Sequence, residues 1–178
     1  MQQTMLALCA VAVFSIYALN STRDEAAMDL RAVTSEGERA AEAVARERLA
    51  AAERVAFDEQ DIGRTTGVRI TPPTSRNGPD AGETAPAHYD DLGDFHGLAE
   101  TRAADTIGGP GGLLFDVSYV VRYVAPSTLA AAAAAVPTLA NEFAVSVVEV
   151  PSAATRGRPQ VRVTLRKVFT PAGMASLR

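Results

Sequence analysis

Residues 5–19 read Met5-Leu6-Ala7-Leu8-Cys9-Ala10-Val11-Ala12-Val13-Phe14-Ser15-Ile16-Tyr17-Ala18-Leu19, and this apolar run decides the fold. No charged side chain occurs in residues 1–22, and the first proline of the chain is Pro72. The run passes, with no glycine or proline before Arg31, into a charged stretch that keeps helical spacing. The sequence therefore predicts one continuous N-terminal helix over residues 1–58, apolar in its first half and amphipathic in its second.

The second half of this helix carries an apolar stripe. Its members recur at steps of three and four residues, which places them on one face of a helix. They are Leu30, Val33, Gly37, Ala40, Ala41, Val44, Ala45, Leu49, Ala52, Val55 and Ala56. Glu42 precedes Arg46 by four residues, the favourable order for an ion pair on a helix. The many small residues predict close packing against other elements, because the leucine or isoleucine seam of a coiled coil is missing.

The predicted helix is too long to be covered by the rest of the chain. About 55 residues in a helix extend roughly 80 Å. Residues 1–22 are uncharged and match the ~20 residues that a bilayer span needs. We therefore expect this segment to lie in lipid or in the core of a polymer. The alternative is a transmembrane anchor followed by a linker or coiled-coil helix. The N-terminus lacks the basic residues that open a secretory signal, which favours a chain whose leader has been removed.

Residues 59–178 predict a β-rich globular head. Proline- and glycine-rich stretches at 72–82 and 108–112 indicate loops. The predicted strands are 113–124, 143–150 and 161–169, with a short edge strand at 68–70 and a short helix between Ser127 and Pro137. In the first of these strands, five side chains alternate onto one face: Phe115, Val117, Tyr119, Val121 and Tyr123. The fold class is α+β, a long N-terminal helix packed on a small antiparallel sheet of three or four strands.

Composition argues against nucleic-acid binding and catalysis. The formal net charge is −4, so the chain has no basic field to attract nucleic acid. Cys9 is the single cysteine, which excludes an intrachain disulfide. His88 and His96 are the two histidines, and both lie in an acidic loop without a nucleophile motif. We expect no enzymatic activity and no organic cofactor.

The acidic loop offers one candidate metal site. Asp90, Asp91 and Asp94 place three carboxylates in a short segment, and carboxylate oxygens are ligands that Ca²⁺ prefers. The twelve-residue pattern of an EF-hand is missing. A solvated acidic turn is therefore the simpler interpretation, and calcium is the alternative.

Three stretches of this sequence support a family resemblance. They are the apolar-then-amphipathic helix, its end at residues 43–49 and 55–59, and the stretch 89–97 before an alternating strand. Together they resemble type IV pilins and the related pseudopilins of type II secretion. One position departs from the family, since mature pilins carry Glu at the fifth residue and this chain has Met5. The neighbouring polar groups are Gln2, Gln3 and Thr4, which can hydrogen-bond to an amine without charge.

The resemblance implies a structural subunit of a helical extracellular filament. Its partners would be other copies of the chain, the inner membrane before assembly, the pilus assembly machinery and a prepilin peptidase. The subunit would be found in a filament at the cell surface, with a precursor pool anchored in the inner membrane. The residues expected to carry assembly are Met1, Met5, Leu6, Leu8, Val11, Val13, Phe14, Ile16, Tyr17 and Leu19.

Two alternatives to a major filament subunit stay open. A minor pseudopilin of a type II-like secretion system would share the same scaffold and would differ in abundance. A single-pass, membrane-anchored binding module belongs to a different class, because its head would function without polymerisation. Adhesion, motility and DNA uptake are all compatible with the scaffold, since such roles depend on the surface of the head.

Overall fold

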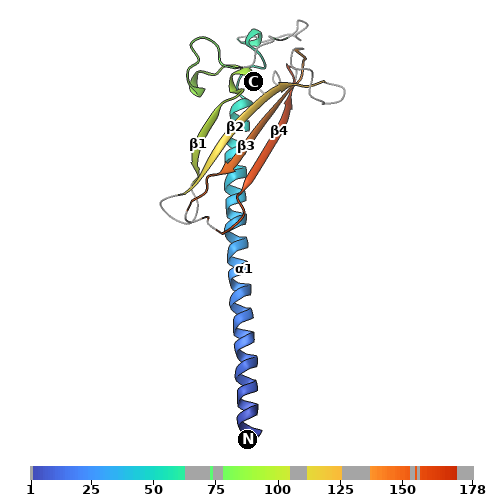
Figure 1. The fold of residues 1–178 in the computed structure, drawn as a ribbon. Helices are drawn as coiled ribbons and strands as arrows, with labels where there is room; N and C mark the ends of the chain where they lie inside the picture. Colours follow the sequence, from blue (N-terminus) through green and yellow to red (C-terminus); the bar gives the residue numbers. More distant parts are fainter. Residues whose placement is uncertain are drawn as a thin grey trace.

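The computed structural model describes residues 2–62, 73, 78–104, 112–125, 137–152, 155 and 157–171. One long helix packs against a four-stranded antiparallel sheet, so the α+β fold class is confirmed (Figure 1). The helix is α1 (Gln2–Ala52), and the strands, paired in the order β1-β2-β3-β4, are β1 (Ala99–Ala104), β2 (Leu113–Tyr123), β3 (Asn141–Glu149) and β4 (Arg162–Phe169). The sheet covers the C-terminal part of α1, and the N-terminal part projects far beyond it (Figure 1).

The helix α1 is continuous over 51 residues, as the absence of early glycine and proline predicts. At 1.5 Å per residue this corresponds to about 75 Å. Arg46 Nη2 donates to Glu42 Oε1 at 2.7 Å, which confirms the predicted pair. Both side chains are exposed, so the pair stabilises the helix by only about 0.3–0.5 kcal/mol.

The helix ends at Ala52, earlier than the predicted end near Asp58. After a turn, Ala56 forms a parallel bridge with the acidic loop: its N–H donates to the Asp90 carbonyl at 2.8 Å, and its carbonyl accepts the Leu92 N–H at 3.0 Å. Asp58 then caps a short 3₁₀ turn through a 3.2 Å bond from the Gln60 amide to Oδ1. These bonds to the loop replace the hydrogen bonds that would continue the helix. Because the loop is distant in the sequence, residues 53–58 alone do not predict where the helix ends.

The core lies between α1 and the inner face of the sheet. In β2 the inward side chains are buried as predicted, namely Phe115, Val117, Tyr119, Val121 and Tyr123. On the helix the matching surface consists of Gly37, Ala41, Val44, Ala45 and Ala52. Because these helical side chains are small, the large residues of the sheet fill the space between the layers. The aromatic rings of Phe95, Tyr119, Phe143 and Phe169 contact one another in sequence, at centroid distances of 5.8–6.2 Å.

The strand β1 was missing from the sequence prediction. Its sequence, Ala-Glu-Thr-Arg-Ala-Ala, has neither the β-branched content nor the apolar alternation that marks a strand. It is an edge strand, held by its backbone pairing to β2, from Ala99↔Ser118 to Ala104↔Leu113. The predicted edge strand at 68–70 and the short helix after Ser127 lie outside the described residues.

Polar contacts join the helix to the sheet at two levels. Glu100 on β1 accepts the Tyr119 hydroxyl at 2.5 Å and lies 3.0 Å from Arg48 Nε of α1. Lys167 Nζ on β4 donates to Glu53 Oε1 at 2.5 Å, just beyond the end of α1. These contacts fix the rotation of the helix against the sheet, which apolar packing alone constrains less.

Gly37 marks the point where the head first closes on the helix. A Cβ atom placed there would lie 3.1 Å from Val161 Cγ2 and 3.5 Å from Leu113 Cδ1. The residue is buried, although glycine inside a helix costs about 1 kcal/mol relative to alanine. The absence of a side chain is what lets the turn between β3 and β4 approach the helix.

We expect Gly37→Leu to separate the lower edge of the head from the helix. The new side chain would overlap Val161 and Leu113, and overpacking of this kind costs about 1–3 kcal/mol. Urea unfolding of the full chain in detergent measures the loss, and Ala43→Leu, on an exposed helical position, is the matched control. Equal stability of the two variants would show that Gly37 does not determine how closely the turn between β3 and β4 approaches the helix.

Candidate assembly surface

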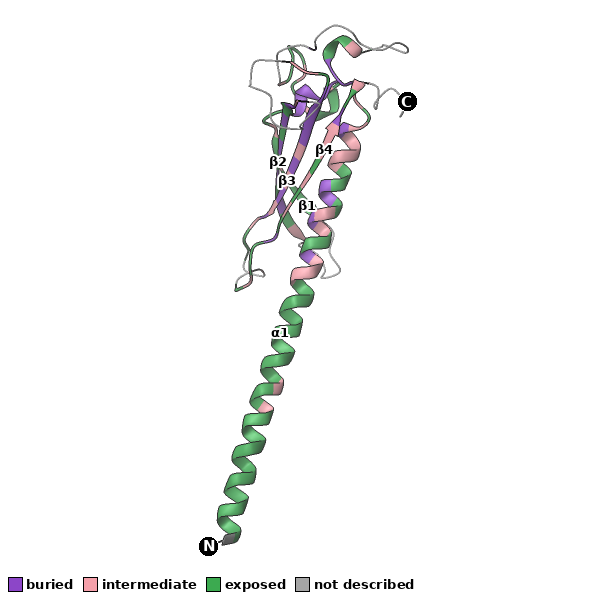
Figure 2. Ribbon diagram, turned by 90° about the vertical axis from the view of Figure 1, so that its right-hand side faces the viewer, coloured by how far each residue is buried: buried purple, intermediate pink, exposed green. Residues whose placement is uncertain are grey.

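The N-terminal half of α1 exposes nearly all of its large apolar side chains. The side chains of Met5, Leu6, Leu8, Val11, Val13, Phe14, Ile16, Tyr17 and Leu19 are 55–72% exposed. Figure 2 shows this part of α1 as almost entirely exposed, whereas the part beside the sheet alternates buried and half-buried residues with exposed ones. The structure thus leaves open nine of the ten residues predicted to carry assembly, and the tenth, Met1, lies outside the described residues.

These apolar side chains lie on every side of the helix. Apolar residues occupy nearly all positions from Met5 to Leu19, so no polar face remains to contact water. A helix that is apolar all round is found inside a bilayer or in the middle of a packed protein core. Covering each large side chain contributes about 1.5–3 kcal/mol, so nine of them provide a large driving force for either environment.

The first half of α1 also meets the requirements of a membrane span. Within the described residues, α1 is a helix long and apolar enough to cross a bilayer, and the apolar window is not buried by the rest of the chain. Ser15 donates its hydroxyl to the Val11 carbonyl at 2.8 Å, which satisfies this polar group within the helix. Cys9 is exposed among the same apolar residues. The segment is therefore compatible with lipid along its whole length.

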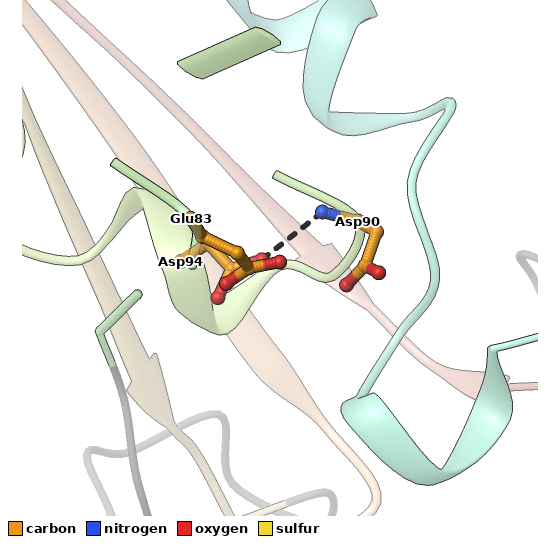
Figure 3. Close-up of side chains that lie close together, drawn as sticks. All are labelled: Glu83, Asp90 and Asp94. Atoms are coloured by element: carbon orange, nitrogen blue, oxygen red, sulfur yellow. Dashed lines mark hydrogen bonds between the residues drawn. The ribbon is translucent and has the colours of Figure 1, made fainter. Parts of the chain in front are cut away.

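The acidic loop gathers three carboxylates, but they are not the predicted three. Oxygens of Glu83, Asp90 and Asp94 lie within 4.8 Å of one another (Figure 3). Glu83, seven residues before Asp90, was missing from the prediction, because only the folded loop brings it close. Desolvation and the negative charge of Glu83 raise the pKa of Asp90. Acidic groups of this kind are common without an ion, so calcium binding stays a prediction.

Asp91 has a structural role in the loop instead. Its Oδ1 accepts the Asp94 N–H at 3.2 Å, and Asp94 Oδ2 accepts the Asp91 N–H at 3.0 Å. This reciprocal pair has the geometry of a capping box, and it opens the 3₁₀ turn at Gly93–Phe95. The turn places Phe95 against Tyr89 and Tyr119 in the core. The Asp-x-x-Asp spacing is thus explained by capping.

The contribution of Asp91 to the stability of the chain is expected to fall as pH rises. Burial, and to a smaller degree the charge of Asp94, raises the pKa of the Asp91 carboxyl to about 7. In the unfolded chain the pKa is about 3.9, so the folded state binds the proton more tightly. The contribution of Asp91 to the free energy of unfolding is therefore largest below pH 4 and decreases, by on the order of a few kcal/mol, between pH 4 and pH 7.

Urea unfolding at pH 5 and pH 8, in the presence of a chelator, measures this effect. Asp91→Asn keeps an acceptor for the Asp94 amide but removes the charge, so this variant should lose the decrease and exceed the wild type at pH 8. Parallel pH profiles for the two chains would contradict the assignment to Asp91.

The two histidines do not join the acidic group. His96 Nδ1 accepts the Val121 N–H at 3.2 Å, which ties the loop to β2. His88 lies at the end of a 3₁₀ turn, and its backbone N–H bonds to the Ala85 carbonyl at 2.9 Å. Among the described residues, the carboxylates of Glu83, Asp90 and Asp94 form the one group of potential metal ligands, and neither imidazole belongs to it.

The chain matches no protein-family model, no curated protein and no solved structure. Its likeness to pilins is therefore one of architecture. A long apolar N-terminal helix, exposed in its first half, packs by its second half on an antiparallel sheet. That pilin-like architecture is what the sequence resemblance implied.

Proposed function

We propose that this chain is a structural subunit of a helical extracellular filament, which polymerises through the N-terminal half of α1. The observation that carries the proposal is the exposure of nine large apolar side chains between Met5 and Leu19 on a helix that its own head does not cover. In a filament the same side chains would pack against neighbouring stems, and the heads would form the outer layer. Contacts between different faces of identical subunits generate such open helical polymers.

The proposal includes a precursor pool in the inner membrane. Lipid can cover residues 1–22 before assembly, because the segment is uncharged and has the length of a bilayer span. Transfer from lipid to a protein core exchanges one apolar environment for another. The pilus assembly machinery would supply the work of extraction, and a prepilin peptidase would produce the mature N-terminus. No catalytic role for the chain itself is included.

Electron microscopy of sheared surface material tests the proposal directly. Filaments that bind an antibody against the head are expected, and the subunit should leave the cell with the sheared fraction. Retention of all the protein in the membrane fraction, with no labelled filaments, would contradict the proposal. Abundance then separates a major subunit, which should be plentiful at the surface, from a minor pseudopilin of a secretion system.

The membrane-anchored binding module makes a different prediction for truncation. Deletion of residues 1–22 would leave the module with a soluble, fully functional head. For a filament subunit, the same deletion abolishes assembly although the head still folds, because the core begins at Gly37. Circular dichroism of the truncated chain and microscopy of cells expressing it give the two readouts.

A further inference from the structure

A cavity opens beside the turn that joins β3 to β4. Its volume is about 470 Å³, which is within the range of sites that hold small organic molecules. Its wall includes Glu149, the last residue of β3, together with Ser152, Arg158 and Gln160 from the turn. β3 ends and β4 begins at the lower end of the sheet in Figure 1, so the cavity lies on the head and is separate from the apolar half of α1.

The charged groups in the wall of the cavity are buried and neutralise each other. The side chains of Glu149 and Arg158 are 1% and 2% exposed, and Arg158 Nη2 donates to Glu149 Oε1. Glu149 Oε2 also accepts the Val161 N–H at 3.2 Å. A ligand with a net charge would therefore bring an unpaired charge to a site that is already neutral and desolvated. The pair favours a neutral occupant.

One buried donor in the wall has no partner. Arg158 Nη1 donates to the Pro159 carbonyl at 3.4 Å, and Nη2 donates to Glu149. Nε is buried as well, but it forms no hydrogen bond within the described residues. A buried donor without an acceptor is unfavourable, because it has lost its bond to water. The cavity therefore favours an occupant that presents an acceptor oxygen to Arg158.

Hydroxyl and amide groups form the more exposed part of the wall. Thr155 Oγ1 accepts the Ser152 N–H at 2.8 Å and donates to the Ser152 carbonyl at 3.2 Å, which closes the turn. Gln160 Nε2 donates to the Glu149 carbonyl at 2.6 Å, and its Oε1 accepts no bond from the described residues. Gly157 contributes no side chain, and a Cβ atom placed on it would meet nothing within 4 Å. The wall thus offers both donors and acceptors, with open space beside them.

We propose that this cavity binds a neutral sugar unit of a glycan. A sugar hydroxyl both accepts and donates hydrogen bonds, so one hydroxyl accepts from Arg158 Nε and a neighbouring one donates to Gln160 Oε1. A phosphate, sulfate or carboxylate would also accept from Arg158, but its charge would approach the buried Glu149 carboxylate. The inference goes beyond the proposed function, because it gives the head a ligand of its own that does not depend on polymerisation.

Binding of methyl glycosides to the full chain tests the proposal. The probes are the methyl glycosides of glucose, galactose, mannose and N-acetylglucosamine, measured by saturation-transfer NMR in a detergent without a sugar headgroup. Arg158→Lys keeps a cation beside Glu149 but removes the Nε–H donor, so the affinity should fall about tenfold, the effect of one hydrogen bond. Gln160→Met removes the amide oxygen at an exposed position and should lower the affinity by a similar factor. Thr164→Val, at an exposed position of β4, is the matched control and should bind normally.

Urea unfolding of each variant accompanies the binding measurement, and Gln160→Met decides the test where Arg158→Lys lowers the stability. The methyl glycoside of glucuronic acid should bind at least tenfold more weakly than that of glucose, because it carries a charge. Failure of all the neutral probes to bind would show that the cavity holds water alone. That result, equal binding of the charged probe, or undiminished binding in Gln160→Met would overturn the inference. Filament formation is a separate measurement, so sugar binding by a chain that forms no filaments would support this site and contradict the proposed function.

Discussion

A chain carrying Val11→Asp is expected to fold its head and to form no filaments. Val11 is 63% exposed and lies 26 residues before Gly37, about 39 Å from the start of the core. The substitution therefore leaves the head unchanged. A carboxylate in the centre of an apolar helix costs about 2.5–3.5 kcal/mol when the helix enters a bilayer, so roughly a hundredfold less subunit should be inserted and ready for assembly.

The measurement is the fraction of subunit recovered in sheared filaments, with circular dichroism of the head as a check of folding. Val120→Asp is the matched control, because Val120 is an exposed residue of the same type on β2. Val11→Leu keeps the apolar character and should assemble. Normal incorporation of the Val11→Asp chain would contradict the role of the apolar segment in assembly.

The second large effect is expected from Glu149→Gln, inside the head. Glu149 and Arg158 form an ion pair whose side chains are 1% and 2% exposed. Glu149 Oε2 also accepts the Val161 N–H at 3.2 Å. Removing the carboxylate charge leaves the guanidinium buried without a counter-charge, which costs about 3–5 kcal/mol. Because an Arg158 Nη2 atom lies 3.6 Å from the position of a Cβ on Gly37, the lower edge of the head should also loosen from α1.

Urea unfolding of the full chain measures this loss, and limited proteolysis near Gly37 reports the loosening. The double variant Glu149→Gln/Arg158→Met leaves no unpaired charge at these two positions and keeps an acceptor for the Val161 amide, so it should recover most of the stability. Glu42→Gln, in an exposed pair with Arg46, is the control and should change stability by less than about 0.5 kcal/mol. A loss in Glu149→Gln no greater than in the control would contradict the assigned role.

Local pattern was enough to predict much of this fold. The long helix follows from the absence of glycine and proline in its first thirty-six residues, and its exposure follows from the small size of the head. The strand β2 was predicted to within one residue, because its alternation of apolar and polar side chains is unbroken over eleven residues. The exposed apolar surface between Met5 and Leu19 was also predicted, since a run of apolar side chains on all sides of a helix is itself a sequence property.

Contacts between distant segments decided the rest. The helix ends at Ala52 because Ala56 forms hydrogen bonds with the loop at 90–92. Residues 53–58 alone do not reveal that partner. The strand β1 exists because β2 offers it a hydrogen-bonding edge, although its own residues favour no strand. Glu83 joins Asp90 and Asp94 through the fold of the loop, whereas Asp91 caps a turn.

The sequence by itself determined the architecture, an apolar stem with a β-rich head, because the patterns of periodicity and charge that predict it involve only neighbouring residues. The tertiary structure decided where the head begins on the stem, through the approach of Val161 to Gly37. That limit leaves residues 22–33 of the same helix exposed. The boundary between the covered and uncovered parts of one helix depends on packing between segments more than a hundred residues apart, which no local pattern records.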